Sequence, residues 1–565
     1  MKSVKYFIFG GLDENAKGKG GYAASCFGFY IDESGSLVKG NGLEEVISTP
    51  GVVTGMWGGT IAGKRILAFV AGNRLYIYNI DTETTTDAGY TGGDESAMFE
   101  FDGKLYILCS GGYYRYDGTT LSSVEGYIPL VAISSTHDGG GTAYESVNML
   151  TPKRRQKFSC NGSATTYRLA ERNIHSVISV AINGEVLSPA GYTVDTVDGI
   201  VTFDIPPAAG LNNMEITYSM TTSSRSVVLG CKKAMLFGSN ADERIFLWGN
   251  ALHPNCRYNS DLADGVPSAE YFPVTGYTYI GSAPITDIVQ HYDRQLIFTK
   301  NSAYLSVCET RTSLSGQTYL SFPVYPLNPS KGSLTCCNGA TVEGMPVSVC
   351  DDGINVWQAT EVESQRNAVC ISTPIKQAVS VGIHSGSTNL TVFSDVSSGR
   401  LFAALGNSIY VYDSNRKCWF KLEGITALRF TSAFGRVYIY SSGMKIYRLS
   451  PSLVNHNAEY TTHFTEFSPG RLVSINSLIL TVKVGDNTAG SVSAVFSGGR
   501  QICRRREEFS IPSNKKGYVE RLKIPMFIPY ADGVSFTFSS PEGKELNLLG
   551  YEVIYTEKGE IPYGT

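Results

Sequence analysis

The sequence predicts an all-β protein: a β-propeller of about seven irregular blades, with an inserted β-sandwich and a C-terminal β-sandwich. Composition and a repeated pattern are the two observations behind this prediction. Of the 565 residues, 60 are glycine and 34 are tyrosine, whereas charged residues make up only 17%. Average chains carry about 25% charged residues and about 7% glycine. Because 42% of the residues are hydrophobic, the composition excludes a disordered chain and favours short strands joined by tight turns.

An apolar strand, a polar turn and a Tyr-rich strand recur along the chain. The first copy is RILAFVAGNRLYIYN at 65–79. The same order returns in the segments 98–117, 234–250, 288–305, 347–357, 400–413 and 428–449. Each copy predicts a hairpin, and small sheets of this kind bury their faces by stacking radially, as propeller blades do. We therefore expect an N-terminal hairpin and the first blades in 1–150, and the remaining blades in 227–455.

Residues 151–226 interrupt the repeats. Alternating apolar and polar residues predict several short strands there, and Asn183-Gly184 and Asp198-Gly199 are typical of hairpin turns. Pro206 and Pro207 exclude a ladder strand at their own position and mark a connection. The segment is predicted to be a small β-sandwich inserted in a propeller loop.

The blade pattern ends near residue 455, and strand-like runs continue to the C-terminus. They lie at 478–484, 491–496, 533–539 and 548–555. Residues 456–565 are therefore predicted to form the second β-sandwich.

Charge and apolar run lengths limit the possible partners. The chain has 47 basic and 51 acidic residues, a net charge of -4, which excludes the strongly basic surface that coats nucleic acid. Apolar runs such as 66–71 are far shorter than the roughly 18 residues of a membrane-spanning helix. The N-terminal apolar run ends at Gly10, too early for a secretory signal, so we expect synthesis in a cytoplasm. The 12 cysteines are scattered through apolar segments and are predicted to be reduced core residues.

Catalytic motifs are weak in this sequence. Residues 350–357 (CDDGINVW) approach the Asp box of sialidase-type propellers, Ser-x-Asp-x-Gly-x-Thr-Trp, but lack its Ser and Thr. The alternative is a type I′ hairpin turn at Asp352-Gly353 followed by a core tryptophan. His137-Asp138 is the one suggestive pair among the seven histidines, and a flexible loop is the better explanation for it. We expect no catalytic residue, no metal site and no cofactor.

Aromatic residues at the strand ends of the blades allow two interpretations, a carbohydrate platform or core packing. Alternation with period two favours packing between blades. The residues concerned are Tyr76, Tyr78, Tyr114, Tyr116, Trp248, Trp357, Tyr410, Tyr412, Tyr438 and Tyr440.

Two basic clusters are candidates for contact with DNA or with a neighbouring subunit. The first comprises Lys153, Arg154, Arg155 and Lys157, and the second comprises Arg500, Arg504, Arg505 and Arg506. Solvated loops are the alternative, and Glu507 and Glu508 would neutralise part of the second cluster locally.

Several segments, taken in order, resemble tail-hub or nozzle proteins of double-stranded DNA bacteriophages, also called packaged-DNA stabilization proteins. The run from Asn259-Ser260-Asp261 to Tyr271-Phe272-Pro273 is similar to a Ser-Asp … Phe-Pro passage of that family, and 288–305 is similar to one of its blades. The ending at 550–555 resembles the close of its C-terminal sandwich. Residues 192–207 resemble a module of phage tail and fibre proteins.

The resemblance implies a structural, non-enzymatic virion protein of the tail or neck, made in the host cytoplasm. It would form a homo-oligomeric ring, expected to be a hexamer, around the DNA exit channel, and would help to retain and release packaged DNA. The implied partners are sister subunits, portal or adaptor proteins, tail fibre or needle proteins, and the DNA itself. The alternatives are a receptor- or glycan-binding propeller at the tail tip and a carbohydrate-active propeller enzyme.

Overall fold

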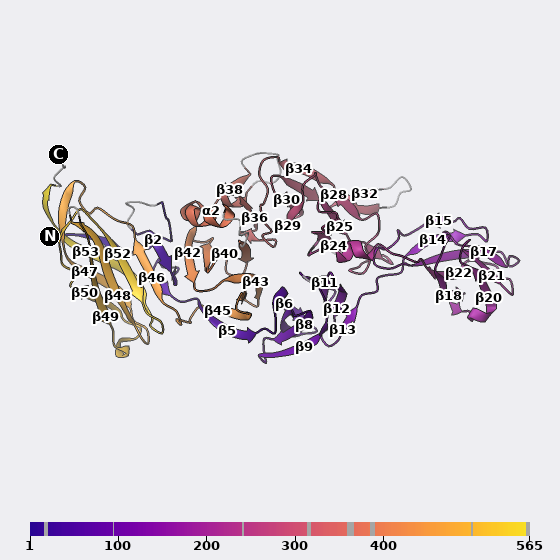
Figure 1. Cartoon of the computed structure of the whole chain (residues 1–565), viewed down its shortest axis with the longest axis horizontal. Helices are drawn as coiled ribbons and strands as arrows, with labels where there is room; N and C mark the ends of the chain where they lie inside the picture. The colour runs from indigo at the N-terminus through magenta and orange to yellow at the C-terminus, as the bar shows by residue number, and fades with distance from the viewer. Residues whose placement is uncertain are drawn as a thin grey trace.

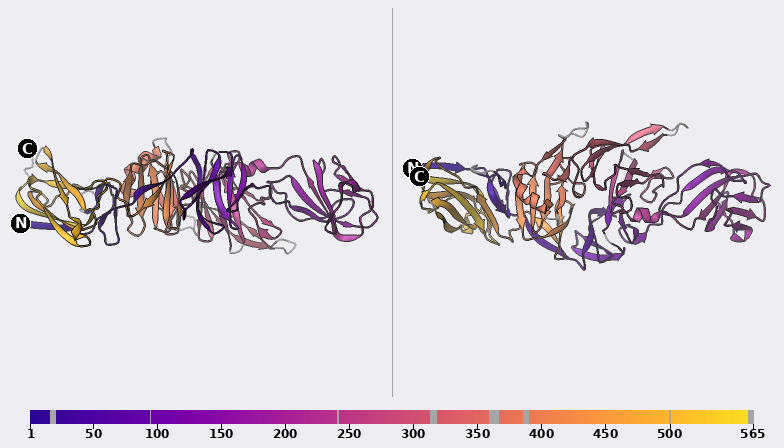
Figure 2. Two further views of the ribbon diagram at one scale, coloured as in Figure 1. Left: turned by 90° about the horizontal axis from the view of Figure 1, so that it is seen from below. Right: turned by 45° about the horizontal axis from the view of Figure 1, so that its top comes forward.

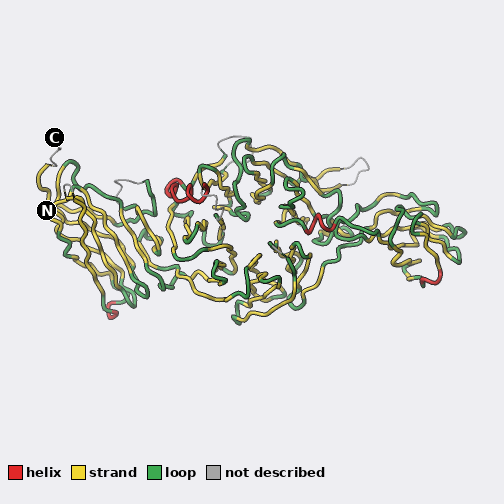
Figure 3. The backbone as a smooth tube through the Cα atoms, in the orientation of Figure 1, coloured by secondary structure: helices red, strands yellow, loops and turns green. Residues whose placement is uncertain are grey.

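The computed structural model is an elongated, almost entirely β protein in which three bodies lie in a row (Figure 1, Figure 3). A seven-bladed propeller occupies the centre, and one β-sandwich projects from each of two opposite edges (Figure 2). The predicted all-β propeller fold is thereby confirmed. The structure describes residues 1–15, 21–93, 95–239, 242–312, 318–358, 367–384, 390–498 and 501–560. No helix in these ranges is long and apolar enough to cross a bilayer.

The propeller consists of seven four-stranded antiparallel sheets. Blade 1 contains β6 (Val53–Ile61), β7 (Lys64–Ala71), β8 (Arg74–Asn79) and β9 (Thr84–Tyr90). Blade 2 contains β10 (Ala97–Phe101), β11 (Lys104–Cys109), β12 (Gly112–Tyr116) and β13 (Leu121–Ser123). Blade 3 contains β23 (Lys233–Ser239), β24 (Asp242–Trp248), β25 (Cys256–Asn259) and β28 (Tyr277–Tyr279), with the hairpin β26 (Leu262–Ala263) and β27 (Val266–Pro267). Blade 4 contains β29 (Ile285–His291), β30 (Arg294–Thr299), β31 (Ala303–Val307) and β34 (Val324–Asn328), with the hairpin β32 (Glu309–Thr312) and β33 (Thr318–Ser321).

The remaining blades complete the ring. Blade 5 contains β35 (Thr341–Val342), β36 (Met345–Cys350), β37 (Gly353–Trp357) and β38 (Ala368–Cys370). Blade 6 contains β39 (Thr391–Asp395), β40 (Arg400–Leu405), β41 (Ser408–Asp413) and β42 (Cys418–Glu423). Blade 7 contains β43 (Ala427–Ala433), β44 (Arg436–Ser441), β45 (Lys445–Ser450) and, from the N-terminal part of the chain, β5 (Gly42–Ser48). The short helices α1 (Arg225–Leu229) and α2 (Lys376–His384) precede blades 3 and 6. Each predicted repeat coincides with two or three consecutive strands of one blade.

The inserted sandwich lies between blades 2 and 3. One sheet has the order β15-β14-β16-β22-β18-β19, and the other has the order β17-β21-β20. The strands are β14 (Leu130–Ser135), β15 (Thr142–Ala143), β16 (Lys153–Cys160), β17 (Thr166–Arg168), β18 (Ser176–Ile182), β19 (Glu185–Val186), β20 (Tyr192–Asp195), β21 (Ile200–Phe203) and β22 (Gly210–Ser219), with a 3₁₀ turn at Pro189–Gly191. The predicted start at residue 151 falls inside this body, because β14 pairs in parallel with β16. Asn183-Gly184 forms the predicted two-residue turn, with positive φ at both residues.

The terminal sandwich contains both ends of the chain. Its sheets have the orders β3-β4-β53-β47-β50, with β1 on β53 and β51 on β47, and β2-β46-β52-β48-β49. The N-terminal strands are β1 (Lys2–Tyr6), β2 (Ala23–Phe27), β3 (Phe29–Ile31) and β4 (Leu37–Lys39). The C-terminal strands are β46 (Ala458–Thr462), β47 (Arg471–Lys483), β48 (Ala489–Gly498), β49 (Gln501–Ser510), β50 (Val519–Ile524), β51 (Ile528–Ala531), β52 (Gly533–Ser540) and β53 (Asn547–Glu560), with a 3₁₀ turn at Ser513–Lys515.

This arrangement corrects the predicted boundary at 1–150. The N-terminal hairpin at 28–42 contributes β3 and β4 to the terminal sandwich, where Leu37 pairs with Leu548, and it is not part of the propeller. Strand β1 likewise pairs with β53, with Lys2 opposite Tyr555. Among the described strands, β5 is the first that belongs to a propeller blade.

The core of the terminal sandwich follows from alternation along β47. Val473 and Ile475 are fully buried, and so are Leu478, Leu480 and Val482. The step from 475 to 478 breaks the two-residue period because a register shift lies between Ile475 and Ser477. The bulge keeps the apolar side of this long central strand on the core.

Candidate functional site

The first basic cluster lies on strand β16 of the insert, and alternation divides it between the two faces. Arg154 forms an ion pair with Glu171 on one face. On the other face, Lys157 lies opposite Glu215, with 3.8 Å between Nζ and Oε2. Among the described residues, no carboxylate lies within ion-pairing distance of Lys153. Contact with DNA or a neighbouring subunit stays a prediction.

Arg155, the fourth member of this cluster, connects the insert to the propeller. Its Nη2 lies 2.9 Å from the Tyr127 hydroxyl and 3.4 Å from Oδ1 of Asp264 in the β26–β27 hairpin of blade 3. Its Nε donates to the Ile128 carbonyl at 3.0 Å, and its guanidinium stacks on the Tyr127 ring at 5.5 Å. Arg155 therefore has a positioning role within the chain.

Three members of the second basic cluster, Arg504, Arg505 and Arg506, lie on β49, an edge strand of the terminal sandwich. Arg505 and Arg506 form ion pairs with Glu507 and Glu508, each at 3.2 Å, so the predicted local neutralisation is confirmed for these two. Arg504 is exposed on the same strand. Arg500 lies outside the described residues. Charged side chains on an edge strand also discourage pairing with foreign strands.

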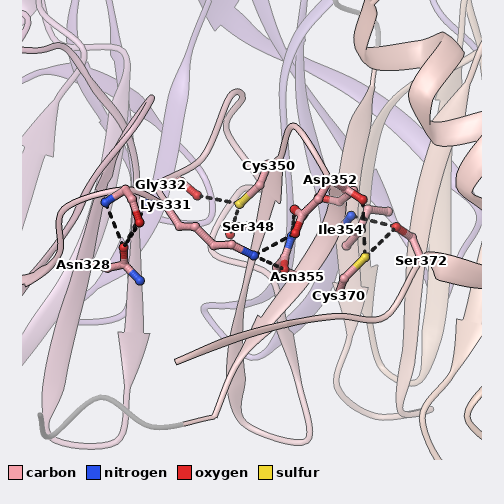
Figure 4. Close-up of polar contacts among 12 residues, drawn as sticks. Asn328, Lys331, Gly332, Ser348, Cys350, Asp352, Ile354, Asn355, Cys370 and Ser372 are labelled. Atoms are coloured by element: carbon pink, nitrogen blue, oxygen red, sulfur yellow. Dashed lines mark hydrogen bonds and ion pairs between the residues drawn. The ribbon is translucent and has the colours of Figure 1, made fainter. Parts of the chain in front are cut away.

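The turn between β36 and β37 contains the Asp-box-like segment (Figure 4). Cys350 pairs with Gly353, so Asp351 and Asp352 are the central turn residues. The predicted type I′ turn is wrong, because neither aspartate has positive φ, whereas Gly353 has φ +132°. The predicted core position of the tryptophan at 357 is confirmed, since it is fully buried.

Asp352 is bound within the fold. Its Oδ2 lies 2.8 Å from Lys331 Nζ, and its Oδ1 accepts from Asn355 Nδ2 at 2.8 Å (Figure 4). Burial raises the pKa of Asp352, but the hydrogen bonds from Lys331 and Asn355 outweigh burial and lower it overall. Lys331 belongs to the connection between blades 4 and 5, so this carboxylate ties that connection to the β36–β37 turn of blade 5.

The aromatic strand ends pack into the cores, as the alternation predicts. Seven of the ten are buried: Tyr78, Tyr116, Trp248, Trp357, Tyr412, Tyr438 and Tyr440. The other three, Tyr76, Tyr114 and Tyr410, are partly buried against core clusters. His137 and Asp138 do approach each other, at 3.4 Å, in the exposed turn between β14 and β15. Within the described ranges, no three His, Cys, Asp or Glu side chains are grouped as a metal site would require.

A cavity at the centre of the propeller was missed by sequence reasoning. It has a volume of about 450 Å³ and is lined by β6, β10, β23, β29, β39 and β43 together with the turn at 336–339, so six blades and the connection between blades 4 and 5 contribute. Four charged residues of the described chain line it: Lys232, Lys233, Asp287 and Arg429. Each lies in or next to the innermost strand of its blade. A charged residue within or next to an otherwise apolar inner strand is the sequence signal that could have indicated a side chain facing the propeller axis.

Lys233 and Asp287 are held in different ways at this cavity. Lys233 Nζ forms an ion pair with Glu95 Oε1 at 2.8 Å. Asp287 is almost fully buried and accepts hydrogen bonds from the backbone N–H groups of Cys337 at 2.8 Å and Gly339 at 3.4 Å, and from the Cys336 thiol at 3.4 Å. Burial raises the pKa of Asp287 to about 6 against the opposing effect of these donors.

Large apolar side chains are exposed on both outer bodies. The insert exposes Val186, Val197, Ile205 and Leu211. The terminal sandwich exposes Tyr518, Val519, Phe527 and Tyr530. Their exposed fractions range from 53% at Phe527 to 80% at Leu211, so these side chains contribute little to the cores of their own domains.

No family model and no curated protein matches this chain. Among solved structures, it is similar to a chain of the mitotic checkpoint complex, with 9% identity, a TM-score of 0.33, and coverage of 72% of this chain and 94% of the other. It is also similar to BBS1N from a complex with ARL6DN, with 12% identity, a TM-score of 0.24, and coverage of 73% and 98%. PorZ of the Porphyromonas gingivalis type-IX secretion system shares 11% identity, with a TM-score of 0.34 over 82% of this chain and 46% of PorZ.

Proposed function

We propose that this protein is a structural component of a phage tail or neck that assembles into a homo-oligomeric ring around the DNA exit path. The observation that supports this proposal is the exposure of large apolar side chains on both outer bodies, such as Leu211 on the insert and Phe527 on the terminal sandwich. Exposed apolar side chains mark protein–protein interfaces where they gather into one patch.

The positions of these side chains favour a ring. The insert and the terminal sandwich lie at opposite ends of the long axis (Figure 1). Contact between the insert of one copy and the terminal sandwich of the next would join two different surfaces, and head-to-tail contacts of this type close into rings when the rotation permits. The cavity of a single propeller, about 450 Å³, is the size of a small-molecule site and does not offer a path for DNA. DNA would therefore pass through the centre of the ring of subunits.

Paired variants test the head-to-tail arrangement. Leu211→Glu places a charge in the apolar surface of the insert, and Phe527→Glu does the same in the terminal sandwich. Both side chains are exposed, so the fold should tolerate the change. By sedimentation velocity and negative-stain electron microscopy, we expect rings for the wild type and monomers for each variant. An equimolar mixture of the two variants retains one intact junction and should give dimers. Val266→Glu, an exposed position on the propeller, is the matched control and should still form rings.

Two results would contradict the proposal. A wild-type chain that stays monomeric at tens of micromolar would remove the basis for a ring. Dimers formed by Leu211→Glu alone would indicate that the sandwich surface pairs with itself, which is not a head-to-tail contact. The virion location is tested separately: antibodies against the chain should label the tail of particles from the strain that carries the gene, and absence of label would reject it.

A glycan-binding role at the tail tip is the second candidate, and one observation favours it. Tyr277 and Tyr279 are about half exposed on β28, the outer strand of blade 3, with their rings edge to face at 5.6 Å and His253 nearby. Such a pair presents apolar faces and polar hydroxyls together. A glycan array should show a signal that Tyr279→Ala removes, and an array without signal would exclude this candidate.

A further inference from the structure

The central cavity of the propeller contains more cationic than anionic groups. Lys232, Lys233 and Arg429 border it, whereas Asp287 and the adjacent Glu95 are the carboxylates found there among the described residues. Three cations therefore face two carboxylates even when both carboxylates are ionised.

Glu95 is shared between the three cations. Burial raises its pKa, but Lys233, Arg429 and Lys232 together outweigh this effect and lower it. Of these three cations, Lys233 is the one that makes a direct ion pair with Glu95. One carboxylate thus partly compensates three positive charges.

Asp287 compensates the cations poorly. Its two oxygens are occupied by donors from the turn at 336–339 and from its own backbone neighbour, the N–H of Ile288 at 3.0 Å. The carboxylate is almost fully buried and is directed into this network of donors. Lys233 contributes only a longer-range attraction to it.

Arg429 keeps hydrogen-bonding capacity. Within the described part of the chain, its one side-chain hydrogen bond runs from Nε to the Val53 carbonyl, at 2.9 Å. Its guanidinium is half-buried, and burial lowers its pKa although Glu95 opposes this. The terminal nitrogens of a guanidinium bind carboxylates and phosphates through two parallel hydrogen bonds.

The rest of the wall is suited to an apolar body. Met56, Met98 and Met235 line the cavity from three different blades. Phe393 and Phe430 also line it, and their rings stack at 5.6 Å with an interplanar angle of 7°. Methionine and aromatic side chains adapt to flat or irregular apolar groups.

We propose that the central cavity binds an organic anion, whose carboxylate or phosphate contacts Arg429 and Lys233 and whose apolar body packs against the methionines and the phenylalanine pair. A volume of about 450 Å³ matches small-molecule sites, which are typically about 300–1,000 Å³ with a few polar groups fixing the orientation. The proposal is independent of ring assembly.

Three compounds with the same naphthalene body separate the contributions of head and body. Isothermal titration calorimetry would measure 1-naphthyl phosphate, 1-naphthoate and the neutral 1-naphthalenemethanol against the full chain. At least one of the two anions should bind about tenfold or more tightly than the alcohol, and the ratio of the two anions identifies the preferred head group. An alcohol that binds as tightly as both anions, or no binding of either anion below about 1 mM, would overturn the proposal.

Variants locate the site. Arg429→Gln should weaken binding of the preferred anion about tenfold or more, because it removes a charge-assisted contact, whereas Arg429→Lys should retain part of the affinity. Arg436→Gln changes an exposed arginine on the neighbouring strand β44 and should leave binding unchanged. Thermal unfolding would check that each variant folds, and Lys233→Met provides a second test of the same pocket. Unchanged affinity in both Arg429→Gln and Lys233→Met would refute the assignment.

Discussion

Arg257 is a fully buried cation between blades 3 and 4, and its replacement by methionine tests how the blades are joined. From β25 it donates through Nη2 to the Ser306 hydroxyl at 2.8 Å and to the Phe322 carbonyl at 2.7 Å, and through Nη1 to Gln295 Oε1. Its guanidinium lies 4.9 Å from the centre of the Phe246 ring. Among the described residues it has no carboxylate partner, and burial lowers its pKa to about 9.

The size of the effect follows from two opposing contributions. Three hydrogen bonds from a charged donor stabilise the fold by about 5–9 kcal/mol in total. The fall in the Arg257 pKa from 12.5 to about 9 indicates that burial opposes this by about 5 kcal/mol. Methionine preserves much of the apolar packing, but Gln295 Oε1 and the Ser306 hydroxyl lose the donor that Arg257 supplies, while the Phe322 carbonyl still accepts from Ser306 at 3.3 Å. We therefore expect Arg257→Met to reduce the free energy of unfolding by about 2 kcal/mol.

Tryptophan fluorescence during urea unfolding is the appropriate assay, because it reports on the propeller. All four tryptophans lie in its blades: Trp57, Trp248, Trp357 and Trp419. Arg257→Met should lower the urea midpoint without changing the m-value. Arg436→Met, at an exposed position on β44, is the matched control and should shift the midpoint little.

A double-mutant cycle with Gln295→Leu makes the reasoning refutable. When both partners become apolar, the unpaired acceptor of Gln295 is removed, so the double variant should be less destabilised than the sum of the single variants by about 1 kcal/mol. Additive effects, or an Arg257→Met protein as stable as the wild type, would show that the arginine does not couple blades 3 and 4.

Three further outcomes are expected. Trp357→Phe leaves a small void and removes the 2.9 Å hydrogen bond from Nε1 to the Ser348 hydroxyl. It should therefore lower the free energy of unfolding by about 2 kcal/mol in the same urea assay. An unchanged urea midpoint would contradict the buried hydrogen bond. The pKa of Asp287 in the folded state, about 6, exceeds its usual 3.8, so its contribution to stability is present below pH 4 and is lost as pH rises towards 6. Between pH 4 and pH 6, the free energy of unfolding of the wild type should therefore decrease relative to that of Asp287→Ala. Parallel profiles of the two proteins would argue against the raised pKa. Deletion of residues 1–39 should make the terminal sandwich sensitive to protease, and a protease-resistant sandwich would contradict its pairing with the N-terminal strands.

The blades were predictable because the contacts that define them are local. In β7 and β8, Ile66 pairs with Asn79 and Ala71 pairs with Arg74, so one hairpin is complete within a short stretch of sequence. The alternation of apolar and aromatic residues along such strands fixes both the strand and its buried face. The same locality explains why the turn at Asn183-Gly184 was predicted correctly.

The domain boundaries were harder to predict because they depend on pairings between distant segments. Strand β1 is short, and nothing in its own residues indicates that Lys2 lies opposite Tyr555. Strand β5 similarly completes blade 7 by pairing with β45 near the other end of the propeller. The sequence places an N-terminal hairpin directly before the first blade repeat and so predicts that both belong to the propeller. In the fold, the hairpin belongs to the terminal sandwich.

Charged residues that are neighbours in the sequence are separated in the fold, whereas charged residues far apart in the sequence come together. Arg154 and Arg155 are neighbours in the sequence, yet strand alternation directs them to opposite faces, and each is paired within the chain. Lys233 and Arg429 come from blades 3 and 7 and lie far apart in the sequence, yet both line one cavity. Closure of the ring creates that proximity, since each blade directs its innermost strand to the same axis. In a propeller, the groups that meet at the axis are therefore better candidates for a binding site than a basic run within one strand.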